Sequence, residues 1–142
     1  MKRGVAMEPT KIVAWFLQGG IIKGYTQNFF PDQPIFHIRP VAPEVSDDLI
    51  EVQMKDLKAI FFVRDFLGNR LYKEEKTLSR GAKIPGRRVE ITFKDKEMMF
   101  GSVMDYDPKR PGFFLFPTDP YSNNLKVFVV SLTVDKVTYL CS

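Results

Sequence analysis

The feature that most constrains this chain is a stretch that occurs twice. Residues 11–40 and 88–117 align without a gap, and each position in the second stretch is numbered 77 above its counterpart in the first. The identical pairs are Phe16/Phe93, Gly24/Gly101, Pro31/Pro108, Pro34/Pro111, Phe36/Phe113 and Pro40/Pro117. Self-similarity at a fixed spacing marks one structural unit used more than once. The sequence therefore predicts two copies of one small unit.

Each copy has the pattern of short β-strands separated by turns. In residues 88–94, apolar and polar side chains alternate, as expected of a strand with one buried face. We expect strands at 11–17, 21–30, 35–39, 49–54 and 59–63, and again at 88–94, 98–105, 113–116, 125–131 and 136–140. Gly24 and Gly101 fall inside the second strand of each copy, where a glycine marks the close approach of another backbone. Five short strands with these turn signals predict a small antiparallel barrel.

The predicted fold class is all-β, with two tandem five-stranded small barrels joined by a basic connector. The first barrel spans residues 11–63, the connector 64–87 and the second barrel 88–142. The net charge of the chain is +4. By our count the connector alone carries a net charge of +4, whereas the first barrel carries −1 and the second 0. Near-neutral barrels do not favour general binding of phosphate backbones. The connector also contains aromatic and leucine side chains, so we expect it to pack on the barrels.

The second copy resembles the first signature of the Sm-like family of small SH3-like barrels. The residues that carry the resemblance are Phe93, Asp95, Gly101, Val103, Tyr106 and Asp107. The first copy keeps Phe16, Gly24 and Phe29 but has Gln18 and Phe30 in place of the aspartates. The sequences FFVRDF at 61–66 and PGFFLFP at 111–117 are also similar to an uncharacterised bacterial family with two such units in tandem. The resemblance implies the fold for both copies.

The uridine-binding site of the Sm-like family is not carried over. In that family the site combines an aspartate-to-asparagine motif after strand two with an Arg-Gly turn between strands four and five. Here Asp107 is followed by Pro108, Lys109 and Arg110, and neither copy has the Arg-Gly pair. Because function depends on sites rather than folds, the resemblance does not imply RNA binding.

The residues required for most enzyme chemistry are missing. His37 is the only histidine and Cys141 the only cysteine, so the chain cannot supply a Cys/His zinc site, and we expect a structural or surface role for His37. No phosphate-binding loop, dinucleotide fingerprint or nucleophile elbow is present. The sequence predicts no catalytic, metal or cofactor-binding residue, hence not an enzyme. A single cysteine and no apolar run of roughly 20 residues favour a cytoplasmic protein without a membrane segment.

Two apolar surfaces are candidates for an interaction with a protein. Val13, Trp15 and Leu17 lie on the strand face where the second copy has Glu90, Thr92 and Lys94. An isolated barrel cannot bury both strand faces, so we expect the connector, the second barrel around Phe100, another chain or a partner to cover them. Val127, Phe128 and Val130 belong to a strand that is apolar on both faces. Since Sm-like barrels pair strand four of one unit with strand five of the next, we expect residues 127–130 to pair with the first barrel or with another chain.

Two function classes remain open. One is a non-enzymatic protein-interaction or scaffold module, with bacterial regulation as one setting and with a protein partner or self-association. The alternative is a nucleic-acid-binding protein that uses a basic patch in the connector together with the barrel aromatics Tyr25, Phe29, Phe30 and Tyr106. The basic patch is Arg70, Lys73, Lys76, Arg80, Lys83, Arg87 and Arg88. The near-neutral barrels and the lost uridine site favour the protein-interaction module.

Overall fold

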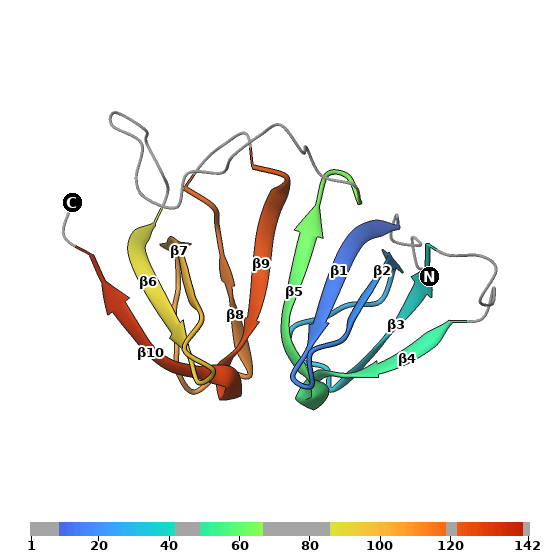
Figure 1. Cartoon of the computed structure of the whole chain (residues 1–142), viewed down its shortest axis with the longest axis horizontal. Coiled ribbons are helices and arrows are strands. Elements are labelled where there is room, and N and C mark those ends of the chain that lie inside the picture. Colours follow the sequence, from blue (N-terminus) through green and yellow to red (C-terminus); the bar gives the residue numbers. More distant parts are fainter. Residues whose placement is uncertain (1–8, 42–48, 67–85, 119–121, 141–142) are drawn as a thin grey trace, which may run out of the picture.

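The computed structural model describes residues 9–41, 49–66, 86–118 and 122–140, and in these residues the protein is all-β. Ten strands form two open sheets, one of seven strands and one of three (Figure 1). The seven-stranded sheet has the order β4-β3-β2-β1-β5-β9-β8, and the other has the order β10-β6-β7. No helix in the described ranges is long and apolar enough to cross a membrane.

Strands β1 to β5 form the first half of the protein, and β6 to β10 form the second. The first half comprises β1 (Thr10–Phe16), β2 (Ile21–Thr26), β3 (Ile35–Pro40), β4 (Ile50–Gln53), the 3-10 helix η1 (Met54–Asp56) and β5 (Leu57–Val63). The second half comprises β6 (Arg87–Phe93), β7 (Met98–Val103), β8 (Gly112–Leu115), β9 (Asn124–Val130), the 3-10 helix η2 (Ser131–Thr133) and β10 (Val134–Tyr139). The bounds of β6, β7 and η2 are those of β1, β2 and η1 shifted by 77 positions.

The two halves have the same strand connectivity. In the first half β5 pairs with β1, which is followed across the sheet by β2, β3 and β4. In the second half β10 pairs with β6 and β6 with β7, and the bridge between Ser102 and Phe116 connects β7 to β8, which pairs with β9. Both halves therefore place their strands in the order five-one-two-three-four, as the constant spacing of the two copies predicts.

Closed barrels are not seen, and the expectation of two closed barrels has to be corrected to two open sheets. Among the described residues, strands four and five of the same half do not pair with each other. The physical reason is visible at the junction of the halves, where β5 uses its remaining edge to pair antiparallel with β9 (Figure 1). The register at this junction places Ile60 opposite Phe128 and Phe61 opposite Val127.

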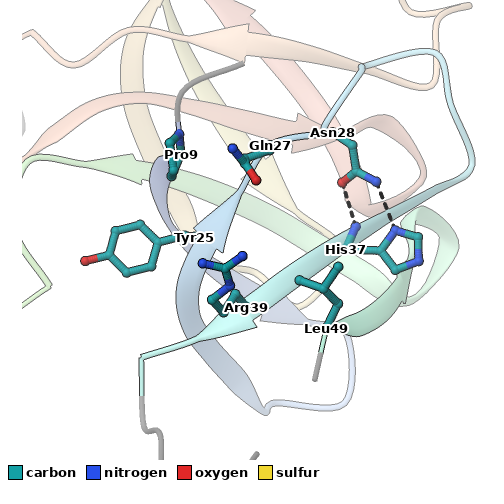
Figure 2. A pocket seen from close by; sticks show the side chains of 7 residues that line it. All are labelled: Pro9, Tyr25, Gln27, Asn28, His37, Arg39 and Leu49. Carbon is teal, nitrogen blue, oxygen red and sulfur yellow. Dashed lines mark hydrogen bonds between the residues drawn. The ribbon is translucent and has the colours of Figure 1, made fainter. Parts of the chain in front are cut away.

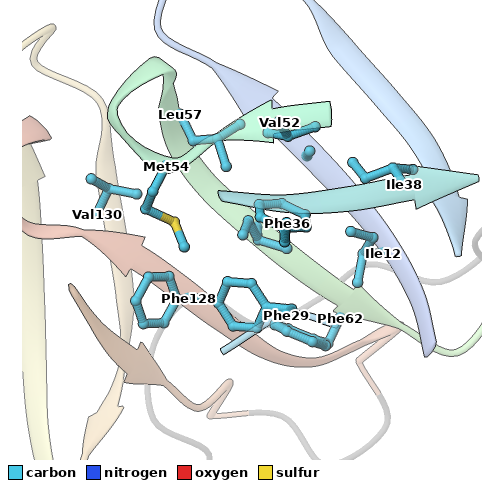
Figure 3. Packing of buried hydrophobic residues seen from close by; sticks show 12 residues of the cluster. Ile12, Phe29, Phe36, Ile38, Val52, Met54, Leu57, Phe62, Phe128 and Val130 are labelled. Atoms are coloured by element: carbon cyan, nitrogen blue, oxygen red, sulfur yellow. The ribbon is translucent and has the colours of Figure 1, made fainter. Parts of the chain in front are cut away.

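The junction also explains why the β9 sequence is apolar on both faces. Phe128 and Val130 point into the core of the first half although they belong to the second, Phe128 next to Phe29 and Val130 near Met54 (Figure 3). Alternate residues of the same strands lie in the core of the second half. These residues are Ala59, Val127 and Val129, and Phe61 packs against them. Each strand of the junction thus contributes to two cores, one on each side of the sheet.

The glycines inside β2 and β7 are positions where a neighbouring strand comes too close for a side chain. A Cβ on Gly24 would lie 2.3 Å from the carbonyl oxygen of Arg39. A Cβ on Gly101 would lie 2.6 Å from the carbonyl oxygen of Phe116, which occupies the position equivalent to Arg39. The sequence-based interpretation of both glycines is confirmed.

Candidate functional site

A groove with a volume of about 700 Å³ lies between the two halves. We call it the inter-half groove. The first half contributes two residues from the turn between β2 and β3, and the second half contributes the remainder. The lining residues are Pro31, Asp32, Val103, Met104, Asp105, Tyr106, Arg110, Pro111, Gly112, Phe113, Phe114, Phe116 and Phe128. A hollow of this size is in the range of ligand-binding sites in proteins.

Aromatic rings in contact with one another form the floor of the inter-half groove. Phe128 is fully buried, and its ring centre lies 5.2 Å from that of Phe114. Tyr106 and Phe113 meet edge to face at 4.7 Å. Gly112 leaves room for this floor, because a Cβ at that position would lie 2.3 Å from the Phe128 ring. The rings hold one another in place, so the groove is shaped before any ligand enters.

The rim of the groove combines a flexible apolar side chain with acidic groups. Met104 is 65% exposed. Arg110 has a carboxylate near it, since its Nε lies 3.9 Å from Asp107 Oδ2. Neither Asp32 nor Asp105 forms an ion pair with any described residue. The groove is therefore apolar at its floor and acidic at its rim.

Burial changes the acid–base behaviour of one groove residue. Burial raises the pKa of the Tyr106 hydroxyl, and the nearby Tyr139 and Asp107 raise it further. The Tyr106 hydroxyl, which like that of any tyrosine is protonated at neutral pH, can donate a hydrogen bond from the edge of the groove.

Of the predicted surface on β1, Trp15 lines a second and smaller hollow, whereas Leu17 lines a different one. Trp15 is half-buried and packs against Phe61 with 5.1 Å between ring centres. Both residues line a groove of about 180 Å³ opposite Met99 and Phe100 of β7. Residues of the second half thus lie across this hollow from Trp15. Val13 is half-buried, and Leu17 remains 54% exposed.

The predicted surface on β9 is not a free surface. Val127, Phe128 and Val130 are 3%, 0% and 4% exposed because β9 pairs with β5. The prediction that this strand is paired is confirmed, with the first half of the same chain as its partner. Its role as an exposed interaction surface has to be withdrawn, although the Phe128 ring contributes to the floor of the groove.

Most of the predicted basic patch lies outside the described residues. These members are Arg70, Lys73, Lys76, Arg80 and Lys83. Arg87 stacks its guanidinium 4.1 Å from the centre of the Tyr139 ring, and Arg88 is half-buried on β6. At the start of the connector, Phe66 packs edge-on against Tyr25 with 5.3 Å between ring centres. The expectation that the rest of the connector packs on the halves likewise concerns residues outside the described ranges.

Sequence reasoning missed the inter-half groove as a site. Its polar residues lie in turns, and turns carry no periodic signal that would place them together in space. One signal was present in the stretch PGFFLFP at residues 111–117. A short strand that is apolar on both faces needs cover on both faces, and here one of those faces borders the groove.

Within the described part of the chain, no group of three or more His, Cys, Asp or Glu side chains could hold a metal ion. No curated protein and no solved structure matches this sequence. A family model does match, over residues 8–141. The match covers nearly all of the 142 residues. The chain therefore belongs to this family, DUF6982, which is described as a family of unknown function.

Proposed function

We propose that this protein is a non-enzymatic protein-interaction module made of two tandem Sm-like units, and that the inter-half groove binds an apolar segment of a partner protein. The observation that carries the proposal is the groove itself. It has a preformed aromatic floor and a methionine that is 65% exposed at its rim. Methionine and aromatic side chains are common where a surface has to accept another protein.

The Sm-like reading is supported by the shared strand order and by the glycines. Both halves have the order five-one-two-three-four, with a 3-10 turn before the last strand. Gly24 and Gly101 bring the backbones of their strands close to β3 and to Phe116, and such close approaches allow a small sheet to curve. If the two halves are Sm-like units, the groove does not belong to either unit alone, because it lies where the two units meet.

The rim charges favour a partner segment that carries a basic side chain. Asp32 comes from the first half and Asp105 from the second, and both line the groove without an ion pair to a described residue. A lysine or arginine next to the apolar anchor of the partner would complement both carboxylates. The proposed ligand is therefore a short segment with an aromatic or aliphatic anchor and an adjacent positive charge.

A partner protein is favoured over repeated self-association through the free edges. Strands β4 and β10 are the outermost strands, at opposite ends of the molecule (Figure 1). Both carry exposed polar side chains, namely Glu51 and Gln53 on β4 and Asp135 and Lys136 on β10. Strands β5 and β9, which do pair between the halves, are apolar on both faces. Charged edge strands resist pairing with another chain.

The proposal can be tested with a random heptapeptide display library selected on the whole protein. We expect the enriched peptides to combine an aromatic or aliphatic residue with lysine or arginine. Met104→Asp should weaken their binding at least about tenfold, because it places a charge against the apolar anchor. Leu132→Asp is the matched control, since Leu132 is 74% exposed and does not line the groove.

The proposal would be rejected by either of two results. One is a selection that enriches no common peptide. The other is a set of peptides that bind the Met104→Asp variant as well as the parent. Circular dichroism of both variants establishes that the fold is retained, and light scattering of the parent shows whether self-association competes with peptide binding.

A further inference from the structure

The first half has a hollow that corresponds to the inter-half groove in position but is lined by residues of different chemical character. It is a hollow of about 230 Å³ on the outer side of β2 and β3 (Figure 2). Its lining residues are Pro9, Tyr25, Gln27, Asn28, His37, Arg39 and Leu49. Four of them correspond to residues of the inter-half groove at the spacing of 77. The pairs are Gln27/Met104, Asn28/Asp105, His37/Phe114 and Arg39/Phe116. The two hollows therefore occupy the same place in the two halves.

The side chains at these equivalent places have opposite character. Where the second half has Phe116 and Met104, the first has Arg39 and Gln27, and no acidic residue lines this hollow. Arg39 is exposed and forms no ion pair with any described residue. The strand register continues the positive charge, because Tyr25 lies between Lys11 and Arg39 on neighbouring strands. Among the residues that line this hollow, Arg39 thus carries the positive charge, beside polar side chains that can donate hydrogen bonds.

The hydrogen bonds of His37 fix which of its ring nitrogens carries the proton. The side-chain oxygen Oδ1 of Asn28 accepts a hydrogen bond from the backbone N–H of His37 at 2.9 Å. The orientation of the amide is then set, so Asn28 Nδ2 is the donor in its 2.9 Å contact with His37 Nδ1. Since Nδ1 accepts, the ring proton is on Nε2. The half-exposed imidazole thus has its N–H donor at Nε2, which lies 4.0 Å from Glu51 Oε1.

We infer that this hollow is a second binding site, for a side-chain carboxylate of an acidic peptide segment. A guanidinium that forms no ion pair with a described residue can hold a carboxylate through two parallel hydrogen bonds. Leu49 and Pro9 provide apolar contacts for the chain that carries the carboxylate. This inference is independent of the inter-half groove, because none of its residues lines that groove.

A short acidic segment is favoured over nucleic acid as the ligand. The hollow has a volume of only about 230 Å³, and residues 11–63 carry a net charge of −1. A polyanion needs several neutralising contacts along its length, and a near-neutral surface with one dominant arginine does not provide them. Nucleic acid therefore enters the test as a competing outcome.

The test is an NMR titration of the full-length, isotope-labelled protein with a capped tetraglutamate peptide. We expect saturable shifts of the Tyr25, Asn28 and Arg39 amides with tetraglutamate and none with capped tetraglutamine. Arg39→Gln should weaken binding about tenfold or more, as expected when a charge-assisted pair is lost. Lys55→Gln is the charge-matched control, because Lys55 is exposed and lies outside the hollow.

Three results would overturn the inference. The first is the absence of shifts in residues 25–39 with tetraglutamate. The second is binding that Arg39→Gln leaves unchanged in a variant whose spectrum shows an intact fold. The third is tighter binding of a ten-nucleotide thymidine strand than of tetraglutamate at the same salt concentration, which would reassign the hollow to nucleic acid.

Discussion

The ammonium group of Lys58 on β5 lies 2.6 Å from Asp95 Oδ2, in the turn that connects β6 to β7 of the other half. The same ammonium also binds Glu97 and lies 4.6 Å from the centre of the Phe93 ring. The side chain of Lys58 is only 11% exposed. The equivalent of Lys58 in the second half is Asp135, which forms no ion pair among the described residues. This cluster therefore belongs to the junction and not to the repeated unit.

Replacing Lys58 should weaken the junction. We expect Lys58→Met to reduce the free energy of unfolding by about 1–2 kcal/mol, between the values typical of exposed and buried ion pairs, because both carboxylates are partly exposed. Urea denaturation measures the difference. Lys55→Met on η1 is the control and should change the stability by less than about 0.5 kcal/mol. Equal effects of the two variants would show that the cluster contributes nothing specific.

The same cluster predicts how stability depends on pH. The hydrogen bond from Lys58 holds the pKa of the Asp95 carboxyl below its usual value of 3.8, with help from the backbone N–H of Glu97. A lowered pKa in the folded state stabilises the protein above the unfolded-state pKa, and this stabilisation is lost as the pH falls through the folded-state value. The stability difference between the parent and Lys58→Met should therefore be full at pH 7 and shrink below about pH 4. Denaturation curves at several pH values would show this convergence. A difference that stays constant down to pH 2 would contradict it.

At alkaline pH, the stabilisation by Lys58 changes with pH in the opposite direction. Burial opposes the charge on Lys58, but the hydrogen bonds and charges of Asp95 and Glu97 outweigh burial and raise the pKa of the amine above its usual 10.5. Its contribution is therefore complete at neutral pH and is lost only as the pH rises through the raised value.

Gly101→Val should be strongly destabilising. The added side chain would start 2.6 Å from the carbonyl oxygen of Phe116 and 2.7 Å from Leu115 Cγ, so β7 and the Phe116 segment would have to separate. We expect a loss of about 3 kcal/mol or more. Gly20→Ala is the control, because a Cβ at that position meets no atom within 4 Å. Thermal unfolding distinguishes the two variants, and a parent-like melting temperature for Gly101→Val would disprove the packing argument.

Trp15→Ala should cost less than the truncation of a fully buried tryptophan. The ring is half-buried against Phe61, so we expect a loss of about 2 kcal/mol rather than the roughly 3–5 kcal/mol of a core residue. Trp15 is the only tryptophan, so the fluorescence of the protein reports directly on how far the Trp15 ring is shielded from water. Its emission should lie between the buried and exposed extremes, with partial quenching by acrylamide. Emission typical of free tryptophan would mean that the second half does not cover it.

The sequence by itself determined where the strands lie and that the two halves share one plan. Alternation of apolar and polar residues, turn signals and glycine positions act over a few residues, and they placed Gly24, Gly101 and nearly every strand correctly. The spacing of 77 between the copies extended this information from one half to the other. Pairing of β9 with the first half was also one of the two predicted alternatives. Residues 127–130 are apolar on both faces, so both faces have to be buried.

Only the tertiary structure decided how the halves meet. Pairing between β5 and β9 depends on the relative placement of two units whose contacts are distant in sequence, and no local pattern encodes it. For this reason the sequence predicted closed barrels, whereas the structure has open sheets in which β5 and β9 join the two halves. The same pairing brings Asp32 and Asp105 to one groove and Lys58 to Asp95. These residues lie in turns or on strand faces, where a polar side chain predicts only that the position is exposed. The residues that contact them come close only after the two halves have packed together.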